Sequence, residues 1–161
     1  MTNQQSRFFS NMALLLVIAF TTGTSANSTQ FDLDGIWKCE QHESTSVSLK
    51  GENNYALEFT QSSNLVIQNG FVTVVNVDTQ LKSAISYELQ FQFVNEENQF
   101  KNTLKNIQYD INIDQLGVFS NGISGLFPAV GETLESKLKI LDDNHIQNVH
   151  ANGEVTNCKK S

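Results

Sequence analysis

Strict two-residue alternation of apolar and polar side chains is the feature that most constrains how this chain folds. From Ile85 to Phe93 every second residue is apolar and each residue between is polar. Side chains two positions apart lie on the same face of a strand, so the segment predicts a long strand with one buried and one wet face. Apolar residues repeat with the same period over 55–59 and 107–113. The repeated pattern is typical of an antiparallel sheet.

Shorter β-rich runs surround these segments, at 35–41, 46–50, 64–68, 71–77, 137–141 and from 145 towards 158. Asn69-Gly70 is a dipeptide that two-residue hairpins prefer, and Asp142-Asp143-Asn144 separates two later runs. About 8–10 strands with no helical pattern between them predict an all-β domain. We expect a single antiparallel up-and-down barrel, with a β-sandwich as the alternative.

One region interrupts the strand pattern. Four glycines and the single proline, Pro128, lie within 117–131 and predict a long connection. Its apolar side chains either fold back over the core or form a ligand lid or partner contact. The next stretch, 132–141, fits both a helical face and a strand, so we expect one short helix that leads into a strand.

The N-terminal segment has the pattern of a cleaved signal peptide. Arg7 gives a weak positive region, Met12 to Phe20 is apolar, and Thr24-Ser25-Ala26 resembles a cleavage site. The apolar run is far shorter than the roughly 20 residues of a spanning helix. We therefore expect 1–26 to be removed and 27–161 to form one exported domain, periplasmic or extracellular, with no membrane span in the mature chain.

The mature chain is acidic. Without Arg7, nine Lys and Arg stand against seventeen Asp and Glu, which changes the net charge from −7 to −8. This balance argues against nucleic-acid binding, which uses clustered basic residues. It favours solubility and could steer a basic protein partner. We expect a monomer.

Cys39 and Cys158 are the two cysteines and lie near the two ends of the mature chain. Export implies an oxidising compartment, so they predict a disulfide. A reactive thiol pair or metal ligands are the alternatives. In a closed up-and-down barrel with an even strand count the first and last strands pair, which would bring the cysteines within reach. A sandwich could also bring its terminal strands together.

Residue types that carry catalysis or bind metals show no specific pattern. Gly122-Ile123-Ser124-Gly125 lacks the G-x-S-x-G spacing of a nucleophile elbow. His145 and His150 are an odd number of positions apart and would point to opposite faces of one strand. His42 has no neighbour at a ligand spacing. We therefore expect no enzyme activity, no metal and no cofactor.

The segment Phe31 to Cys39 contains Gly35-Ile36-Trp37 at the start of the mature domain. It resembles the opening of lipocalin-like (calycin) proteins, in which G-x-W begins the first barrel strand. The resemblance implies that Gly35 permits a close backbone approach and that Trp37 packs across one end of the barrel. It also implies carriage of a small apolar or amphipathic ligand inside the barrel.

The candidates for the ligand-lining surface are the aromatic residues of the alternating faces, namely Tyr55, Phe59, Tyr87, Phe91, Phe93 and Tyr109. Non-catalytic ligand binding is thus the leading hypothesis. The alternatives are an acidic protein-binding module, such as an inhibitor of a basic secreted hydrolase, and a structural or assembly subunit that exchanges an edge strand.

Overall fold

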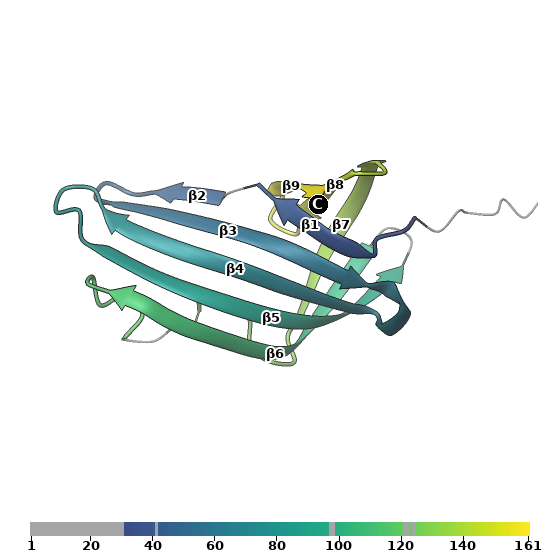
Figure 1. The fold of residues 1–161 in the computed structure, drawn as a ribbon, viewed down its shortest axis with the longest axis horizontal. Helices are drawn as coiled ribbons and strands as arrows, with labels where there is room; N and C mark the ends of the chain where they lie inside the picture. Colours follow the sequence, from purple (N-terminus) through teal and green to yellow (C-terminus); the bar gives the residue numbers. More distant parts are fainter. Residues whose placement is uncertain (1–30, 41, 97–98, 121–122, 124) are drawn as a thin grey trace, which may run out of the picture. The chain divides into compact units, whose positions relative to one another are not determined.

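The predicted β architecture is confirmed in the computed structural model, which describes residues 31–40, 42–96, 99–120, 123 and 125–161. The chain forms an all-β, antiparallel, up-and-down closed barrel (Figure 1). The segment 1–26, predicted to be a signal peptide, lies outside the described residues. The strands are β1 (Gly35–Cys39), β2 (His42–Thr45), β3 (Leu49–Thr60), β4 (Leu65–Asn76), β5 (Lys82–Glu96), β6 (Gln99–Asp114), β7 (Thr133–Asp142), β8 (His145–His150) and β9 (Val155–Lys160).

Strand β1 closes the barrel. It pairs with β9 on one side and with Ala56–Phe59 of β3 on the other. Strand β2 pairs farther along the same edge of β3, with Lys50–Asn53. Since β1 and β2 follow one another along β3, the nine strands occupy eight positions around the barrel.

The alternation from Ile85 to Phe93 produces the burial that it predicts. In β5 the apolar side chains of this segment are at most 5% exposed, whereas the polar residues between them are only partly buried. Strand β5 pairs along nearly its whole length with β4 and β6, with two register shifts against β6. It therefore forms the middle of the largest continuous part of the sheet.

The two ends of the barrel differ in pairing. At one end, which we call the closed end, β6 pairs with β7 through Gln99–Thr103, and β7, β8, β9 and β1 complete the circle. Beyond Leu104 the outer edge of β6 pairs with no strand among the described residues. We call this the open end; it contains 107–114 of β6 and the parts of β3, β4 and β5 beside it, the long strands of Figure 1.

The hairpin predicted at Asn69-Gly70 is wrong, because β4 runs through both residues. Gly70 lies opposite Tyr87 of β5. A Cβ atom at Gly70 would lie 2.2 Å from Cζ of Tyr87. A glycine inside a strand can mark such a close approach as well as a turn, and here the tyrosine ring explains it.

The short helix expected within 132–141 is also wrong, because β7 occupies this stretch. Ser136 and Leu138 are buried while their neighbours are exposed, so the strand period prevails. Among the described residues the helical structure is one 3-10 turn at Gln61–Ser63. The turn predicted around Asp143-Asn144 is confirmed between β7 and β8.

The predicted disulfide is confirmed at the closed end. Cys39 of β1 lies directly opposite Cys158 of β9, and the two are bonded. Beside them Trp37 is fully buried, and its Nε1–H donates to the Leu33 carbonyl at 2.8 Å. Lys160 Nζ lies 5.3 Å from the centre of the Trp37 ring, within the range of a cation–π contact.

Candidate ligand cavity

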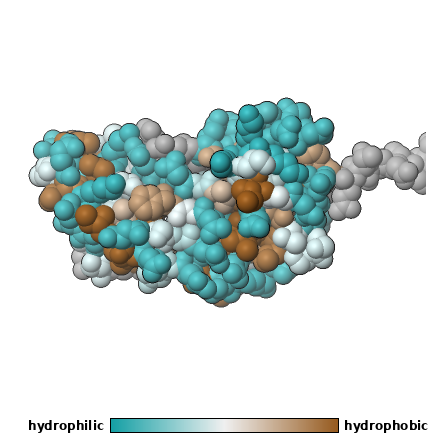
Figure 2. All heavy atoms as spheres, in the orientation of Figure 1, coloured by the Kyte–Doolittle hydropathy of each residue, from teal (hydrophilic) through white to brown (hydrophobic). Residues whose placement is uncertain are grey.

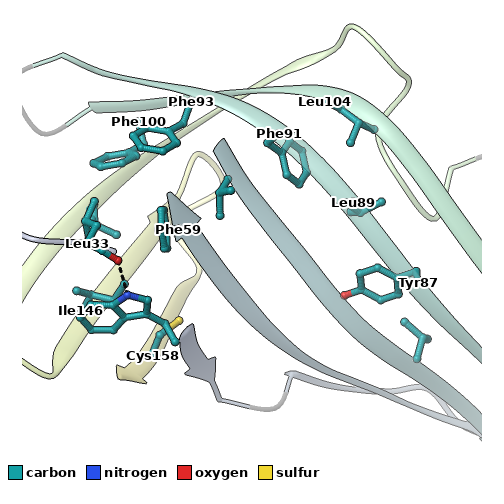
Figure 3. Close-up of a cluster of buried hydrophobic side chains, with 14 of the residues drawn as sticks. Leu33, Phe59, Tyr87, Leu89, Phe91, Phe93, Phe100, Leu104, Ile146 and Cys158 are labelled. Atoms are coloured by element: carbon teal, nitrogen blue, oxygen red, sulfur yellow. Dashed lines mark hydrogen bonds between the residues drawn. The ribbon is translucent and has the colours of Figure 1, made fainter. Parts of the chain in front are cut away.

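A row of apolar side chains on β5 forms the floor of the candidate site. Figure 3 shows Tyr87, Leu89 and Phe91 following one another along one face, while Phe93 continues towards the closed end. Phe93 is stacked on Phe100 with ring centres 5.7 Å apart and touches Phe59 edge-on at 5.9 Å. These three rings form an aromatic cluster at the closed end.

A cavity of about 600 Å³ lies over this floor, where the long strands face the connection between β6 and β7. We call it the outer cavity. Its lining comes from 51–55 of β3, from β4 and β5, from Leu126, Phe127 and Pro128 of the connection, and from Leu134, His150 and Glu154. The volume falls within the range of small-molecule sites, which are mostly apolar with a few polar groups.

Tyr87 is the most constrained side chain in this cavity. Its ring lies over Gly70 and packs against Phe127 with ring centres 4.9 Å apart. Its hydroxyl donates to Oδ1 of Asn53 at 3.0 Å and accepts from Nε2 of Gln68 at 3.0 Å. Burial raises the pKa of the Tyr87 phenol. The phenol is therefore neutral at physiological pH, and its hydrogen-bonding capacity is used within the protein.

The connection that covers the outer cavity is held at its start by Asp114. The carboxylate accepts from the Ser83 hydroxyl at 2.7 Å, from the Ser120 backbone N–H at 2.8 Å and from the Phe119 backbone N–H at 3.2 Å. Hydrogen bonds from Ser120 and Ser83 lower the pKa of Asp114. Phe119 is 6% exposed and belongs to the core. The predicted long connection thus folds back over the core at this point.

A second cavity of about 100 Å³, which we call the inner cavity, lies towards the closed end. Tyr55, Gln68, Phe91, Leu134 and His150 line both cavities, so the two adjoin. The inner cavity has a polar side as well as an apolar one. Its polar members include Asn102, Ser136 and Asn148, and its apolar members include Phe59, Val66, Phe100 and Leu138.

Two acceptors in the inner cavity lack a partner within the described part of the protein. The Oδ1 atoms of Asn102 and Asn148 are buried and accept no hydrogen bond. Nearby polar groups are paired, since Nε2 of His150 lies 3.0 Å from the Thr156 hydroxyl. Buried polar groups are nearly always satisfied by protein or water. These two oxygens therefore mark a place where a donor fits.

The residues predicted to line a ligand site occupy three kinds of position. Tyr55, Phe59, Tyr87 and Phe91 line one or both cavities. Phe93 is 4% exposed and packs in the aromatic cluster of the closed end. Tyr109 lies opposite Tyr87, on the part of β6 whose outer edge pairs with no described strand, and is 45% exposed. Ligand binding by any of these residues stays a prediction.

Sequence reasoning placed Phe127 only among the apolar residues of the 117–131 connection, which cover the core or form a lid, and it did not name the two asparagines. Phe127 lies in an irregular connection, where no period indicates which side chain turns inward. Asn102 is the third residue after Gln99 in β6, and it shares its face with Phe100 and Leu104, which are buried. That spacing was a usable signal, because an asparagine between two inward apolar residues is an inward polar group.

The histidines and acids are arranged as ordinary surface or paired groups. His145 and His150 lie on opposite faces of β8, with the His145 ring against the Asp142 carboxylate at 2.8 Å. The pKa of Asp142 is lowered by hydrogen bonds from the Asn144 backbone and from His145. Over the part of the chain that the structure describes, no three His, Cys, Asp or Glu side chains gather as metal ligands would.

Comparisons with models of protein families and with curated proteins found no match. The closed antiparallel barrel is compatible with the lipocalin-like fold that the Gly35-Ile36-Trp37 segment resembles. Gly35 has a φ of +115°, in the region that favours glycine. None of the described residues forms a helix of the length and hydrophobicity needed to cross a bilayer.

Proposed function

We propose that this protein is an exported, non-catalytic, lipocalin-like binder of a small apolar or amphipathic molecule. The observation that carries the proposal is the outer cavity of about 600 Å³ between the apolar floor on β5 and the β6–β7 connection. Its continuation into the inner cavity gives space for an elongated molecule with a polar end.

The apolar lining supplies the driving force for binding. Val72, Val74, Leu89 and Phe127 present hydrocarbon to the outer cavity, and burial of apolar ligand surface against them is favourable by about 25 cal/mol per Å². Transfer of a chain of ten or more methylenes from water would thus outweigh the cost of ordering it. A fully hydrophilic solute has no comparable gain there.

Export is supported by two separate features. The segment 1–26 has the charge, apolar run and small-residue pattern of a signal peptide. The Cys39–Cys158 disulfide is the kind of bond that persists in oxidising compartments. Together they favour a periplasmic or extracellular carrier.

The experiment is to fill the outer cavity and measure binding of a neutral fluorescent fatty-acyl probe. Val72 of β4 is 8% exposed and lines the cavity, so Val72→Trp places an indole where the ligand would lie. The matched control is Thr73→Trp on the opposite face of the same strand. We expect Val72→Trp to abolish saturable binding and Thr73→Trp to retain it, with both variants folded by circular dichroism. Equal binding by both variants, or none by the natural protein, would refute the proposal.

A second candidate function, binding of a partner protein, is favoured by the edge of β6. Residues 108–113 are all exposed, and among the described residues no strand pairs with their outer edge. Tyr109, Ile111 and Ile113 are 45%, 44% and 38% exposed. Unpaired strand edges are templates for strand addition, and the acidic chain would attract a basic partner.

The partner hypothesis is tested by titrating the protein with a basic secreted hydrolase at low and at high salt. A complex that weakens with salt and is lost in Ile111→Lys, but not in the outward-facing control Gln108→Lys, supports it. A salt-insensitive response, or equal behaviour of the two variants, counts against it.

A further inference from the structure

Two inward-facing asparagines, Asn102 on β6 and Asn148 on β8, form a polar wall of the inner cavity. Their partners on β7 are Leu134 and Leu138, four residues apart, so the two side chains lie at different levels of this wall. Asn148 of β8 lies opposite Thr156 of β9 and Leu138 of β7, and Asn102 of β6 lies opposite Phe93 of β5. Phe93 and Leu138 are core residues, so both asparagines share the inner face with the core. The far wall, with Phe59 and Val66, is apolar. The inner cavity is thus amphipathic.

This polar wall contains hydrogen-bond acceptors that have no donor among the described residues. The side-chain carbonyl oxygens of Asn102 and Asn148 are buried without a partner. A buried acceptor without a donor is unfavourable, and it is relieved by a group that brings an O–H or N–H. A ligand hydroxyl that reaches either oxygen would satisfy it.

The charges around the cavities argue against an ionised ligand end. None of the described residues that line either cavity is a lysine or an arginine. Of the three glutamates at the lining, Glu135 and Glu154 are exposed and Glu52 is paired with Lys50 at 2.7 Å. A carboxylate in the inner cavity would meet the two acceptors, and the basic side chain in the described lining, His150, has its Nε2 on the Thr156 hydroxyl. An ammonium there would lie among the amides and hydroxyls of the wall. Burial of an unpaired charge is strongly unfavourable.

Resting on the proposed function, we propose that the ligand is an uncharged amphiphile whose hydroxyl-bearing head donates to Asn102 Oδ1 or to Asn148 Oδ1. Its hydrocarbon chain occupies the outer cavity over Tyr87 and Leu89. The orientation follows from the order of the cavities, because the acceptors lie in the inner cavity and the apolar floor continues outward. The recognised chemistry is a neutral hydroxyl head on an apolar chain.

The test compares probes of one chain length by isothermal titration at pH 8, above the ordinary pKa of an imidazole, about 6.5. Dodecane-1,2-diol has two donors, dodecan-1-ol has one, and dodecanoate has none and carries a charge. We expect the two neutral probes to bind at least tenfold more tightly than dodecanoate. Dodecanoate that binds as tightly as the diol would overturn the inference.

Variants assign the effect to the two oxygens. Leucine has nearly the shape of asparagine without its polar atoms, so Asn102→Leu and Asn148→Leu should both fold. The variant that removes the accepting oxygen should lower diol affinity about fivefold to tenfold, which is the worth of one hydrogen bond. Asn106→Leu, at a partly buried β6 position opposite Gln90, is the matched control and should bind the diol normally. Unchanged diol affinity in both inner variants would show that water satisfies these oxygens.

The outcomes separate this inference from the proposed function. If all three probes bind equally and Val72→Trp blocks them, the cavity is a ligand site and the inference about the head group is wrong. If no probe binds to the natural protein, the proposed function fails and the inference fails with it.

Discussion

The closed end and the open end of this barrel share the strands β3 to β6 but bury their apolar side chains by different means. At the closed end, where strand pairing completes the barrel and a disulfide joins β1 to β9, Trp37, Leu104 and Ile146 are 0% exposed. At the open end Tyr109 and Ile111 are nearly half exposed, because β6 has no further strand among the described residues to cover them. Pairing therefore decides burial more than residue type does.

The two ends also differ in how tightly their side chains pack and in how much space they leave inside the barrel. The closed end contains the aromatic cluster of Phe59, Phe93 and Phe100 seen in Figure 3, and such packing leaves little space. The open end is covered by an irregular connection, and the outer cavity lies beneath it. Figure 2 shows separate hydrophobic patches on a largely hydrophilic face. The larger cavity therefore lies at the open end, and the inner cavity of about 100 Å³ lies towards the closed end.

Removal of the disulfide is expected to have the largest effect. Cys39 and Cys158 are separated by 119 positions, and the chain-entropy treatment of so long a loop gives about 4 to 5 kcal/mol. The double variant Cys39→Ser/Cys158→Ser should lose stability of that order in urea unfolding. Val47→Ser, at a fully exposed position, should change it by less than about 0.5 kcal/mol. A small loss in the double variant would mean that pairing of β1 with β3 and β9 suffices to close the barrel.

The second-largest effect is the difference in lost stability between aromatic truncations at the two ends. Trp37→Ala removes a fully buried indole and its hydrogen bond to Leu33, and should cost about 3 to 5 kcal/mol. Tyr109→Ala at the open end removes a half-exposed ring and should cost less than about 1 kcal/mol. Because Trp37 is the single tryptophan, unfolding must be followed by circular dichroism. Equal losses would contradict the division between the ends.

The contact between Gly70 and Tyr87 tests the floor of the outer cavity. Gly70→Ala places a methyl group against the Tyr87 ring, and overpacking of this kind costs about 1 to 3 kcal/mol. In Gly70→Ala/Tyr87→Leu the smaller side chain should relieve the clash, so the double variant should be less destabilised than the sum of the two single variants. Additive losses in the double-mutant cycle would mean that the ring is not what requires glycine there.

The two-residue alternation of apolar and polar side chains was sufficient to predict the sheet. It does not indicate which residues lie opposite one another on neighbouring strands. The alternation over Ile85–Phe93 and the terminal positions of Cys39 and Cys158 predicted the buried face and the closing disulfide. The Asn69-Gly70 dipeptide was misleading, because its glycine makes room for the ring of Tyr87. Tyr87 is 17 positions away in the chain and lies opposite Gly70 in the sheet. Local turn preference cannot register such a contact.

Among the residues of the candidate site, only those that lie on strands were predictable from the sequence. Tyr55, Tyr87 and Phe91 follow the strand period and line the cavities. The positions of Phe127 and of the Asp114 anchor depend on how the irregular connection folds. Hydrogen bonds of Asp114 with Ser83 and Ser120 hold this connection, and no repeating pattern in the sequence indicates them. Inward asparagines are likewise recognised only after the register of their strand is known.

The smallest effect concerns the Asp114 anchor and depends on pH. Hydrogen bonds from Ser120 and Ser83 hold the pKa of Asp114 below its ordinary value of about 3.9 in an unfolded chain. A carboxyl with a depressed folded-state pKa contributes stability that is fully present above the unfolded value and is lost as pH falls through the folded value. The anchor should therefore be intact at pH 7 and weaken progressively below about pH 4.

Asp114→Asn should abolish this dependence while it leaves the strands in place. Urea midpoints of the natural protein and of Asp114→Asn should differ at pH 7 and converge towards pH 3, and the connection 115–132 should be cleaved faster by protease in the variant at pH 7. Asp110→Asn, an exposed carboxylate on the same strand, is the control and should match the natural protein in cleavage. If Asp114→Asn is cleaved no faster, burial of Phe119 alone holds the connection over the cavity, and the open end is more firmly covered than its hydrogen bonds suggest.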